Sequence, residues 1–301
     1  MKIAVLTARK KLLVAALAAS LLAVCPASAT DVYWVGATTN WSDTLNWLAE
    51  NTTTYTSPAN NEANFNFNTA VSSPGLVTIN VDGAYGTPGS GTAQAWGMYF
   101  THTNGYQTVF IQPGITWALQ NQAIPKAGGG GFEVAPSSTN NSGANGGNTP
   151  GITYTNHTII TGVGGTFLCN GGFRVEGGSS VVDNHYTILD MSGLGTFILT
   201  NGPAPGNPSG GYGAFYLVDG TTHSQGLIYL ALTNVITLAS NFQVGYLGYS
   251  SNSLPIGVYL GQSNYIFTGV SNNNNLVIGS AGCTNAFLQF NPAFLGWIKT
   301  V

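Results

Sequence analysis

The sequence predicts an all-β protein folded as a right-handed parallel β-helix, a solenoid with coils of about 30 residues and an N-terminal β cap. Two observations support this fold class. A short phrase, glycine followed by an apolar strand, recurs at nearly constant steps, and the chain is 44% hydrophobic with only 6% charged residues. A fixed step in this range is typical of solenoids, whose coils bury their apolar faces by stacking on their neighbours.

Three phrases recur in the second half of the chain. The glycine phrase begins at Gly165, Gly195, Gly226 and Gly257, at nearly equal steps of about 30 residues, and Ala286 continues the series. The second phrase is Phe132-Glu133-Val134, Phe173-Arg174-Val175, Phe242-Gln243-Val244 and Leu276-Val277-Ile278, and the third contains Asn156-His157 and Asn184-His185. Three short strands per coil predict inward columns of Phe, Ile, Val and Leu.

Residues 1–29 have the features of an export signal. Lys2, Arg9, Lys10 and Lys11 form a positive start, residues 12–24 are apolar, and Ala27-Ser28-Ala29 is a small-residue cleavage site. The apolar stretch is too short to span a bilayer comfortably. We therefore expect a mature chain without a membrane span, located outside the cell, on its surface or in the periplasm.

The mature chain has few cations. Four of the seven basic residues lie in the signal, which leaves Lys126, Arg174 and Lys299 against all ten acidic residues. Nucleic-acid binding requires clustered Lys and Arg to neutralise phosphates. The glycines at residues 128–131 are followed by no Lys-Ser or Lys-Thr pair, so nucleotide binding is unsupported as well.

Three regions follow the signal. Residues 30–125 form an N-terminal β cap and first rungs, with expected strands at 32–35, 77–81, 108–111 and 115–119 and a hairpin signal at Asn104-Gly105. Residues 126–151 form a Gly/Ser/Asn-rich loop region with Phe132-Glu133-Val134 as a strand-like island. Residues 152–301 form the regular β-helix, which lacks a polar cap on its last coil and therefore looks truncated at its C-terminus.

Two further pairs of residues carry structural expectations. Asn234 and Asn264 lie one predicted coil apart, so we expect their side chains to stack in a hydrogen-bonded ladder. Cys169 and Cys283 lie several coils apart, too far for a disulfide, and we expect both to be packed as small apolar residues.

The sequence resembles the bacterial autotransporter-associated β-strand repeat proteins, which are large exported passengers. The resemblance rests on Val32-Tyr33-Trp34-Val35-Gly36, on the Asn-Trp pairs Asn40-Trp41 and Asn46-Trp47, and on the phrase Ser57-Pro58-Ala59-Asn60-Asn61-Glu62-Ala63-Asn64-Phe65, which has Glu where the family usually has Asp. It extends to Leu189-Asp190-Met191-Ser192-Gly193 and Tyr259-Leu260-Gly261-Gln262-Ser263-Asn264. The resemblance implies a cell-surface or extracellular location and brings no catalytic residues.

Several side chains are candidates for functional sites, and for each we favour a structural role. Arg174 and Glu176 alternate on one strand and predict an outward ion pair rather than a lyase base. Asp183, Asp190 and Asp219 precede turn residues, so we expect them to cap turns rather than form a hydrolase pair.

The histidines and tryptophans also have a structural and a functional interpretation. His157 and His185 are expected to stack in successive coils, and with His102 and His223 they lack the further ligands that zinc requires. Trp34, Trp41 and Trp47 are expected to cover the first coil with Tyr33 and Phe65, the alternative being a sugar-stacking platform.

The sequence as a whole predicts an exported structural or adhesive β-solenoid with no catalytic residue, cofactor or metal. Its expected partners are extracellular glycans or cell-surface components, met by a polar face rich in Asn, Thr, Ser and Tyr. The alternative function is a polysaccharide-degrading β-helix enzyme, a lyase or a glycoside hydrolase. Clustered carboxylates on one face of the solenoid would distinguish the enzyme from the scaffold.

Overall fold

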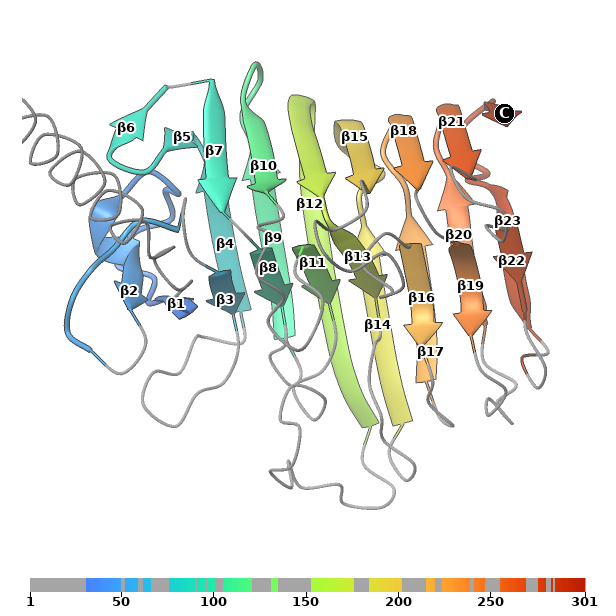
Figure 1. Cartoon of the computed structure of the whole chain (residues 1–301), viewed down its shortest axis with the longest axis horizontal. Helices are drawn as coiled ribbons and strands as arrows, with labels where there is room; N and C mark the ends of the chain where they lie inside the picture. Colours follow the sequence, from blue (N-terminus) through green and yellow to red (C-terminus); the bar gives the residue numbers. More distant parts are fainter. Residues whose placement is uncertain are drawn as a thin grey trace, which may run out of the picture.

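The chain forms a parallel β-helix whose coils stack side by side along one long axis (Figure 1). The computed structural model describes residues 31–49, 52–58, 62–65, 76–89, 91–95, 97–100, 105–120, 131–134, 153–175, 184–201, 215–219, 224–238, 241–246, 255–268, 276–279, 283 and 285–300. The predicted fold class, an all-β parallel solenoid, is confirmed.

Three sheets run along the solenoid, and each regular coil contributes one strand to each sheet. Neighbouring strands are parallel except at the N-terminal end of sheet 1, where β2 pairs antiparallel with β1. Sheet 1 has the order β2-β1-β3-β8-β11-β13-β16-β19-β22, sheet 2 the order β4-β9-β12-β14-β17-β20-β23, and sheet 3 the order β7-β10-β12-β15-β18-β21-β24. The long strand β12 belongs to sheets 2 and 3, with a register shift between Gly162 and Thr166 where it passes from one to the other. The described helix η1 is a short 3-10 turn at Thr44–Asn46.

The strands of sheet 1 are β1 (Asp31–Trp34), β2 (Trp47–Ala49), β3 (Glu62–Phe65), β8 (Gly97–Phe100), β11 (Gly131–Val134), β13 (Gly172–Val175), β16 (Phe215–Asp219), β19 (Phe242–Tyr246) and β22 (Leu276–Ile278). Sheet 2 consists of β4 (Leu76–Val81), β9 (Gly105–Ile111), the first half of β12 (Thr153–Asn170), β14 (Asn184–Asp190), β17 (Ser224–Tyr229), β20 (Ile256–Leu260) and β23 (Ala286–Phe290). Sheet 3 consists of β7 (Thr92–Ala95), β10 (Thr116–Gln120), the second half of β12, β15 (Leu194–Asn201), β18 (Thr233–Leu238), β21 (Ser263–Thr268) and β24 (Trp297–Thr300), and β5 (Gly83–Ala84) and β6 (Thr87–Pro88) form a separate ribbon.

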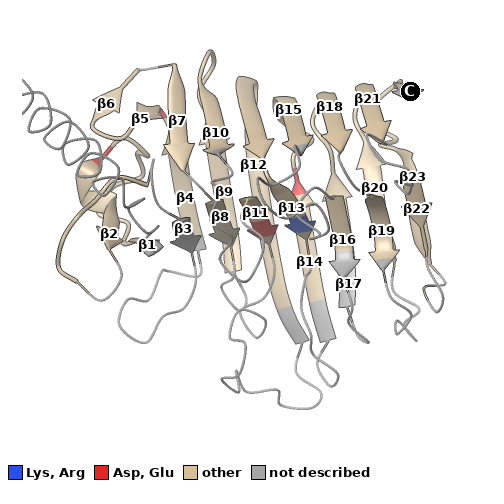
Figure 2. Ribbon diagram, viewed as in Figure 1, with Lys and Arg blue, Asp and Glu red and all other residues tan. Residues whose placement is uncertain are grey.

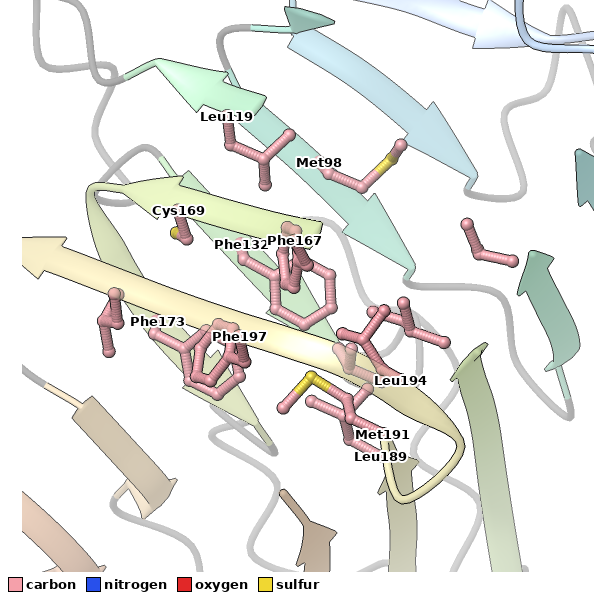
Figure 3. Packing of buried hydrophobic residues seen from close by; sticks show 14 of the residues in the cluster. Met98, Leu119, Phe132, Phe167, Cys169, Phe173, Leu189, Met191, Leu194 and Phe197 are labelled. Carbon is pink, nitrogen blue, oxygen red and sulfur yellow. The ribbon is translucent and has the colours of Figure 1, made fainter. Parts of the chain in front are cut away.

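Aromatic columns fill the space between sheets 1 and 3. In sheet 1, Phe132, Phe173, Phe215 and Phe242 occupy matched positions of four successive strands and stack at centroid distances of 5.1, 5.1 and 4.2 Å. In sheet 3, Phe167 and Phe197 stack at 5.4 Å. Phe197 also contacts Phe173 across the core at 5.1 Å, so the two columns interlock (Figure 3). Buried and half-buried residues alternate along strands such as β13 and β18, because successive side chains point to opposite faces, and the inward positions form these columns.

The alignment of the recurring phrases is confirmed in part. The Phe132, Phe173, Phe242 and Leu276 phrases all lie in sheet 1 and in register, and Phe167 pairs with Phe197 as expected. The glycine series, however, changes sheet: Gly165 and Gly195 precede strand residues of sheet 3, whereas Gly226 and Gly257 lie in sheet 2. In sheet 2 the register pairs Gly226 with Ile256 and not with Gly257, so the true step there is one residue shorter than the glycine series indicates.

The parallel ladders begin before residue 152, where we expected the regular helix to start. Strands β3, β4 and β7 already pair with β8, β9 and β10 of the next coil. The hairpin predicted at Asn104-Gly105 is wrong, because β8 pairs with β3 and β11 while β9 pairs with β4 and β12. In a solenoid a turn signal marks a corner, since each strand finds its partners in the coils before and after it.

Candidate functional site

The three tryptophans at the N-terminal end lie inside the protein. Trp34, Trp41 and Trp47 are 1%, 0% and 0% exposed. Trp47 contacts both other rings edge to face, with centroids 5.0 Å from Trp34 and 4.6 Å from Trp41, and its Nε1 donates to the Trp41 carbonyl. A buried ring offers no face to a ligand, so the sugar-platform interpretation of these residues is wrong.

The two acidic residues considered for hydrolysis that the structure describes lie on strands of different sheets. Asp190 ends β14 in sheet 2, whereas Asp219 ends β16 in sheet 1, and Asp183 lies outside the described residues. Asp190 Oδ1 accepts the backbone N–H of Ser192 at 2.8 Å, the turn-capping role that we expected. Among the described residues there is also no group of three or more His, Cys, Asp and Glu side chains that would hold a metal.

The histidine ladder is wrong. The register pairs His157 with Ile188 and Tyr106, and it pairs His185 with Tyr154, which offsets the two histidines by three positions. The His157 ring instead meets the ring of Tyr106 edge to face at 4.8 Å. Burial lowers the pKa of His157, and the nearby Asp190 opposes this shift only in part, so the imidazole is neutral at pH 7. His102 and His223 lie outside the described residues.

Arg174 has an acidic neighbour on the adjacent coil. The register places Glu133 of β11 beside Arg174 of β13, and Figure 2 shows this acidic and this basic position on neighbouring strands. Phe173 and Val175 point into the core, so Arg174 faces outward from sheet 1. Opposite charges at paired positions stabilise neighbouring strands. Glu176, the partner that we predicted, and Lys126 lie outside the described residues.

The outer surface of sheet 2 carries the most distinctive side chains outside the core. Two outward columns follow from the register, and each crosses several coils. The first column contains Tyr106, His157, Ile188, Leu227, Gly257 and Phe287, and the second contains Thr78, Thr108, Ile159, Asp190, Tyr229, Tyr259 and Gln289. We call this surface the tyrosine face. It spans seven strands, about 29 Å at the usual spacing between strands.

Contacts between rings order the C-terminal half of the tyrosine face. Tyr229 and Tyr259 stack with centroids 4.5 Å apart and planes 5° from parallel, and Phe287 meets Tyr259 edge to face at 5.1 Å. Phe287 also covers Gly257, where an added Cβ would lie 2.0 Å from the Phe287 ring. Glycine at position 257 therefore lets this aromatic ring lie flat against the strand.

Tyr229 is surrounded by groups that keep its hydroxyl protonated. Burial raises its pKa most, and Tyr259, Asp190 and Tyr186 raise it further. A hydrogen bond with Tyr259 adds to the effect. The Tyr229 hydroxyl is thus a neutral hydrogen-bonding group at any physiological pH, and the face offers aromatic rings and hydroxyls together.

Sequence reasoning missed the tyrosine face. Tyr229 and Tyr259 are separated by one coil of sheet 2, and this spacing is the signal from which their contact follows. Aligning the coils on Gly226 and Gly257 assumes a step one residue longer than the true step between register partners. This alignment places Tyr229 and Tyr259 one position apart, so their contact does not appear in it.

Comparisons with protein-family models, with curated proteins and with solved structures give no match to this chain. In the described part of the chain, no helix has the length and apolar character needed to cross a membrane.

Proposed function

We propose that this protein is an exported, non-catalytic β-solenoid of the cell surface or extracellular space, which binds glycans through its tyrosine face. The export signal at residues 1–29 and the resemblance to autotransporter-associated repeat proteins support the location. The side chains on the outer surface of sheet 2 support glycan binding, and the placement of the carboxylates supports a non-catalytic role.

A single observation carries the glycan proposal: on the tyrosine face, Tyr229 and Tyr259 lie in register and stack, and Phe287 packs against Tyr259. Tyr106 is 42% exposed, and Tyr229, Tyr259 and Phe287 are half-buried in one continuous group of rings. Sugar rings present apolar C–H groups and hydroxyls, which match an aromatic ring and its phenolic hydroxyl. Stacked tyrosines on a rigid sheet lose little conformational entropy on binding, so their contact area favours affinity.

The arrangement of carboxylates favours binding over hydrolysis. A glycoside hydrolase requires two carboxyl groups about 5 to 9.5 Å apart. On the described strands of sheet 2, Asp190 is the single acidic residue, and Asp219 belongs to sheet 1. This separation supports a scaffold rather than a polysaccharide-degrading enzyme.

A polysaccharide panel tests the proposal. Purified residues 30–301, shown to be folded and β-rich by circular dichroism, are mixed with soluble and insoluble polysaccharides. Retention of the protein is measured together with the release of new reducing ends and of unsaturated products. We expect retention on at least one polysaccharide and no product. Product release would overturn the non-catalytic assignment, and absence of retention across the panel would overturn glycan binding.

A further inference from the structure

One carboxylate lies in the middle of the tyrosine face. Asp190 is on β14, the central strand of sheet 2, and Figure 2 shows it as the red end of that strand. The described strands of sheet 2 contain no other Asp or Glu and no Lys or Arg. The tyrosine face therefore surrounds one carboxylate with aromatic, aliphatic and neutral polar side chains.

Tyrosines adjoin this carboxylate on its C-terminal side. Tyr229 is the register partner of Asp190 on the next coil, and Tyr259 stacks on Tyr229 one coil further. Tyr186 stands on β14 itself, four positions before Asp190 and therefore on the same side of the strand. Because the Tyr229 and Tyr259 rings face each other, they present their outer edges and hydroxyl groups to a ligand that binds beside the carboxylate.

On the other side of Asp190, the described part of the face supplies no cation. Its register partner on β12 is Ile159, and the neighbouring His157 is neutral at pH 7. Arg174 lies in sheet 1 and Lys299 in sheet 3. The charge of Asp190 is thus available to a cation from outside.

Asp190 is also held in place. The bond from the Ser192 N–H to Oδ1, 2.8 Å long, occupies one of the roughly four acceptor sites of a carboxylate. The turn orients the group while it leaves acceptor capacity for a ligand. A fixed carboxylate beside stacked rings is pre-organised for a donor that is both charged and attached to a flat apolar body.

We propose that Asp190, Tyr229 and Tyr259 form a site for a protonated amino sugar, with the sugar ammonium donating to Asp190 and the sugar ring packing against the outer edges and hydroxyls of the stacked Tyr229 and Tyr259 rings. This inference rests on the glycan-binding function proposed above and specifies its ligand class: polysaccharides that contain free glucosamine units rather than neutral or N-acetylated ones. Acetylation removes the charge and so removes the interaction with the carboxylate.

Calorimetric titrations with two matched oligosaccharides test the site. The probes are a glucosamine tetramer and an N-acetylglucosamine tetramer, used with purified residues 30–301 at about pH 7, where His157 is neutral and part of the sugar amines is protonated. We expect the glucosamine tetramer to bind about tenfold more tightly, a difference of about 1.4 kcal/mol. Asp190→Asn keeps an oxygen for the Ser192 N–H but removes the charge, and it should abolish the preference.

Asp43→Asn is the matched control, because it removes one negative charge from an exposed cap of η1 far from sheet 2's central strand. It should leave the preference intact. If Asp190→Asn and Asp43→Asn lose the preference for the glucosamine tetramer to the same extent, the proposed site is overturned, because the net charge of the protein alone would then explain the preference. Equal affinity of the wild-type protein for both tetramers would overturn the amino-sugar inference while glycan binding stands. If neither tetramer binds but the polysaccharide panel shows retention, the amino-sugar inference fails and glycan binding stands. If the panel shows no retention either, both the inference and the proposed glycan-binding function fail.

Discussion

Asn234 Nδ2 donates a hydrogen bond of 2.8 Å to Asn264 Oδ1 on the next coil, and both side chains are fully buried. Each asparagine also closes its own corner between sheets 2 and 3. Asn234 Nδ2 donates to the Ala231 carbonyl, and Asn264 bonds both the N–H and the carbonyl of Gly261. The predicted asparagine ladder is confirmed, and its structural role is to satisfy the backbone where the chain turns inside the core.

Replacing Asn264 by leucine should destabilise the protein strongly. Asn264→Leu removes the side-chain amide that bonds the Gly261 N–H, the Gly261 carbonyl and the Asn234 side chain, all of which lie in the buried turn between sheets 2 and 3. We expect a loss of about 3 kcal/mol in the free energy of unfolding, because unsatisfied buried groups cost about 1 to 3 kcal/mol each. Urea denaturation measures it, and Thr237→Val on the half-buried side of β18 is the control. An unchanged midpoint for Asn264→Leu would contradict the ladder's role.

Gly261 allows the close approach of two coils. An added Cβ would lie 1.7 Å from the Ala231 carbonyl oxygen, which belongs to the backbone and cannot move aside. Gly261→Ala should therefore abolish soluble expression or lower the melting temperature sharply. Gly91→Ala, where nothing lies within 4 Å of the new Cβ, is the matched control and should leave the melting temperature nearly unchanged. Similar behaviour of the two variants would show that the coils do not meet at Gly261.

Phe197 joins the two aromatic columns of the core. Its ring contacts Phe167 in sheet 3 and Phe173 in sheet 1. Phe197→Ala should cost about 3 to 5 kcal/mol, the usual cost of a phenylalanine cavity. Ile198→Ala, at the next and outward-facing position, should cost about 1 kcal/mol or less. Comparable midpoints in urea for these two variants would argue against the assigned inward and outward faces.

The thiols of Cys169 and Cys283 should differ in reactivity. Cys169 is fully buried, and burial raises its pKa to about 12, whereas Cys283 is half-buried. The thiolate is the reactive form, so iodoacetamide at about pH 8 should modify Cys169 only after unfolding. Mass spectrometry of the native and the denatured protein measures the modification at each cysteine. Rapid alkylation of Cys169 in the folded protein would contradict its position in the core.

The sequence indicated the fold class and part of the register, because strand alternation and inward Phe, Val and Asn positions recur from coil to coil. The recurring phrases align Phe132, Phe173 and Phe242 as the structure does, and the 30-residue step aligns Asn234 with Asn264. These residues point into the core. A register shift of one position would move each of these side chains to the outer face, so the inward positions determine the register.

The outer faces were harder to predict, because a half-exposed position tolerates many residue types. The similar phrases at His157 and His185 suggested a stack, yet the register offsets them by three positions. Tyr229 and Tyr259 meet because their strands are register partners on successive coils, and aligning neighbouring glycines hid this. The connections between strands of sheet 2 and the following strands of sheet 3 are short, so both strands fall within one apolar stretch of sequence. Periodicity alone therefore does not show to which of the two sheets a residue belongs.

The measurement that tests the central claim most directly compares two tyrosines of the same chain. Tyr259 lies on the tyrosine face, and Tyr265 is also a half-buried tyrosine but lies on sheet 3, where it packs edge to face on Trp297. Retention of each alanine variant on the polysaccharide that binds the wild-type protein is measured. We predict that Tyr259→Ala weakens binding by about tenfold, or about 1.4 kcal/mol, while Tyr265→Ala binds like the wild type. Equal retention of the two variants would contradict the assignment of sheet 2 as the glycan-binding face.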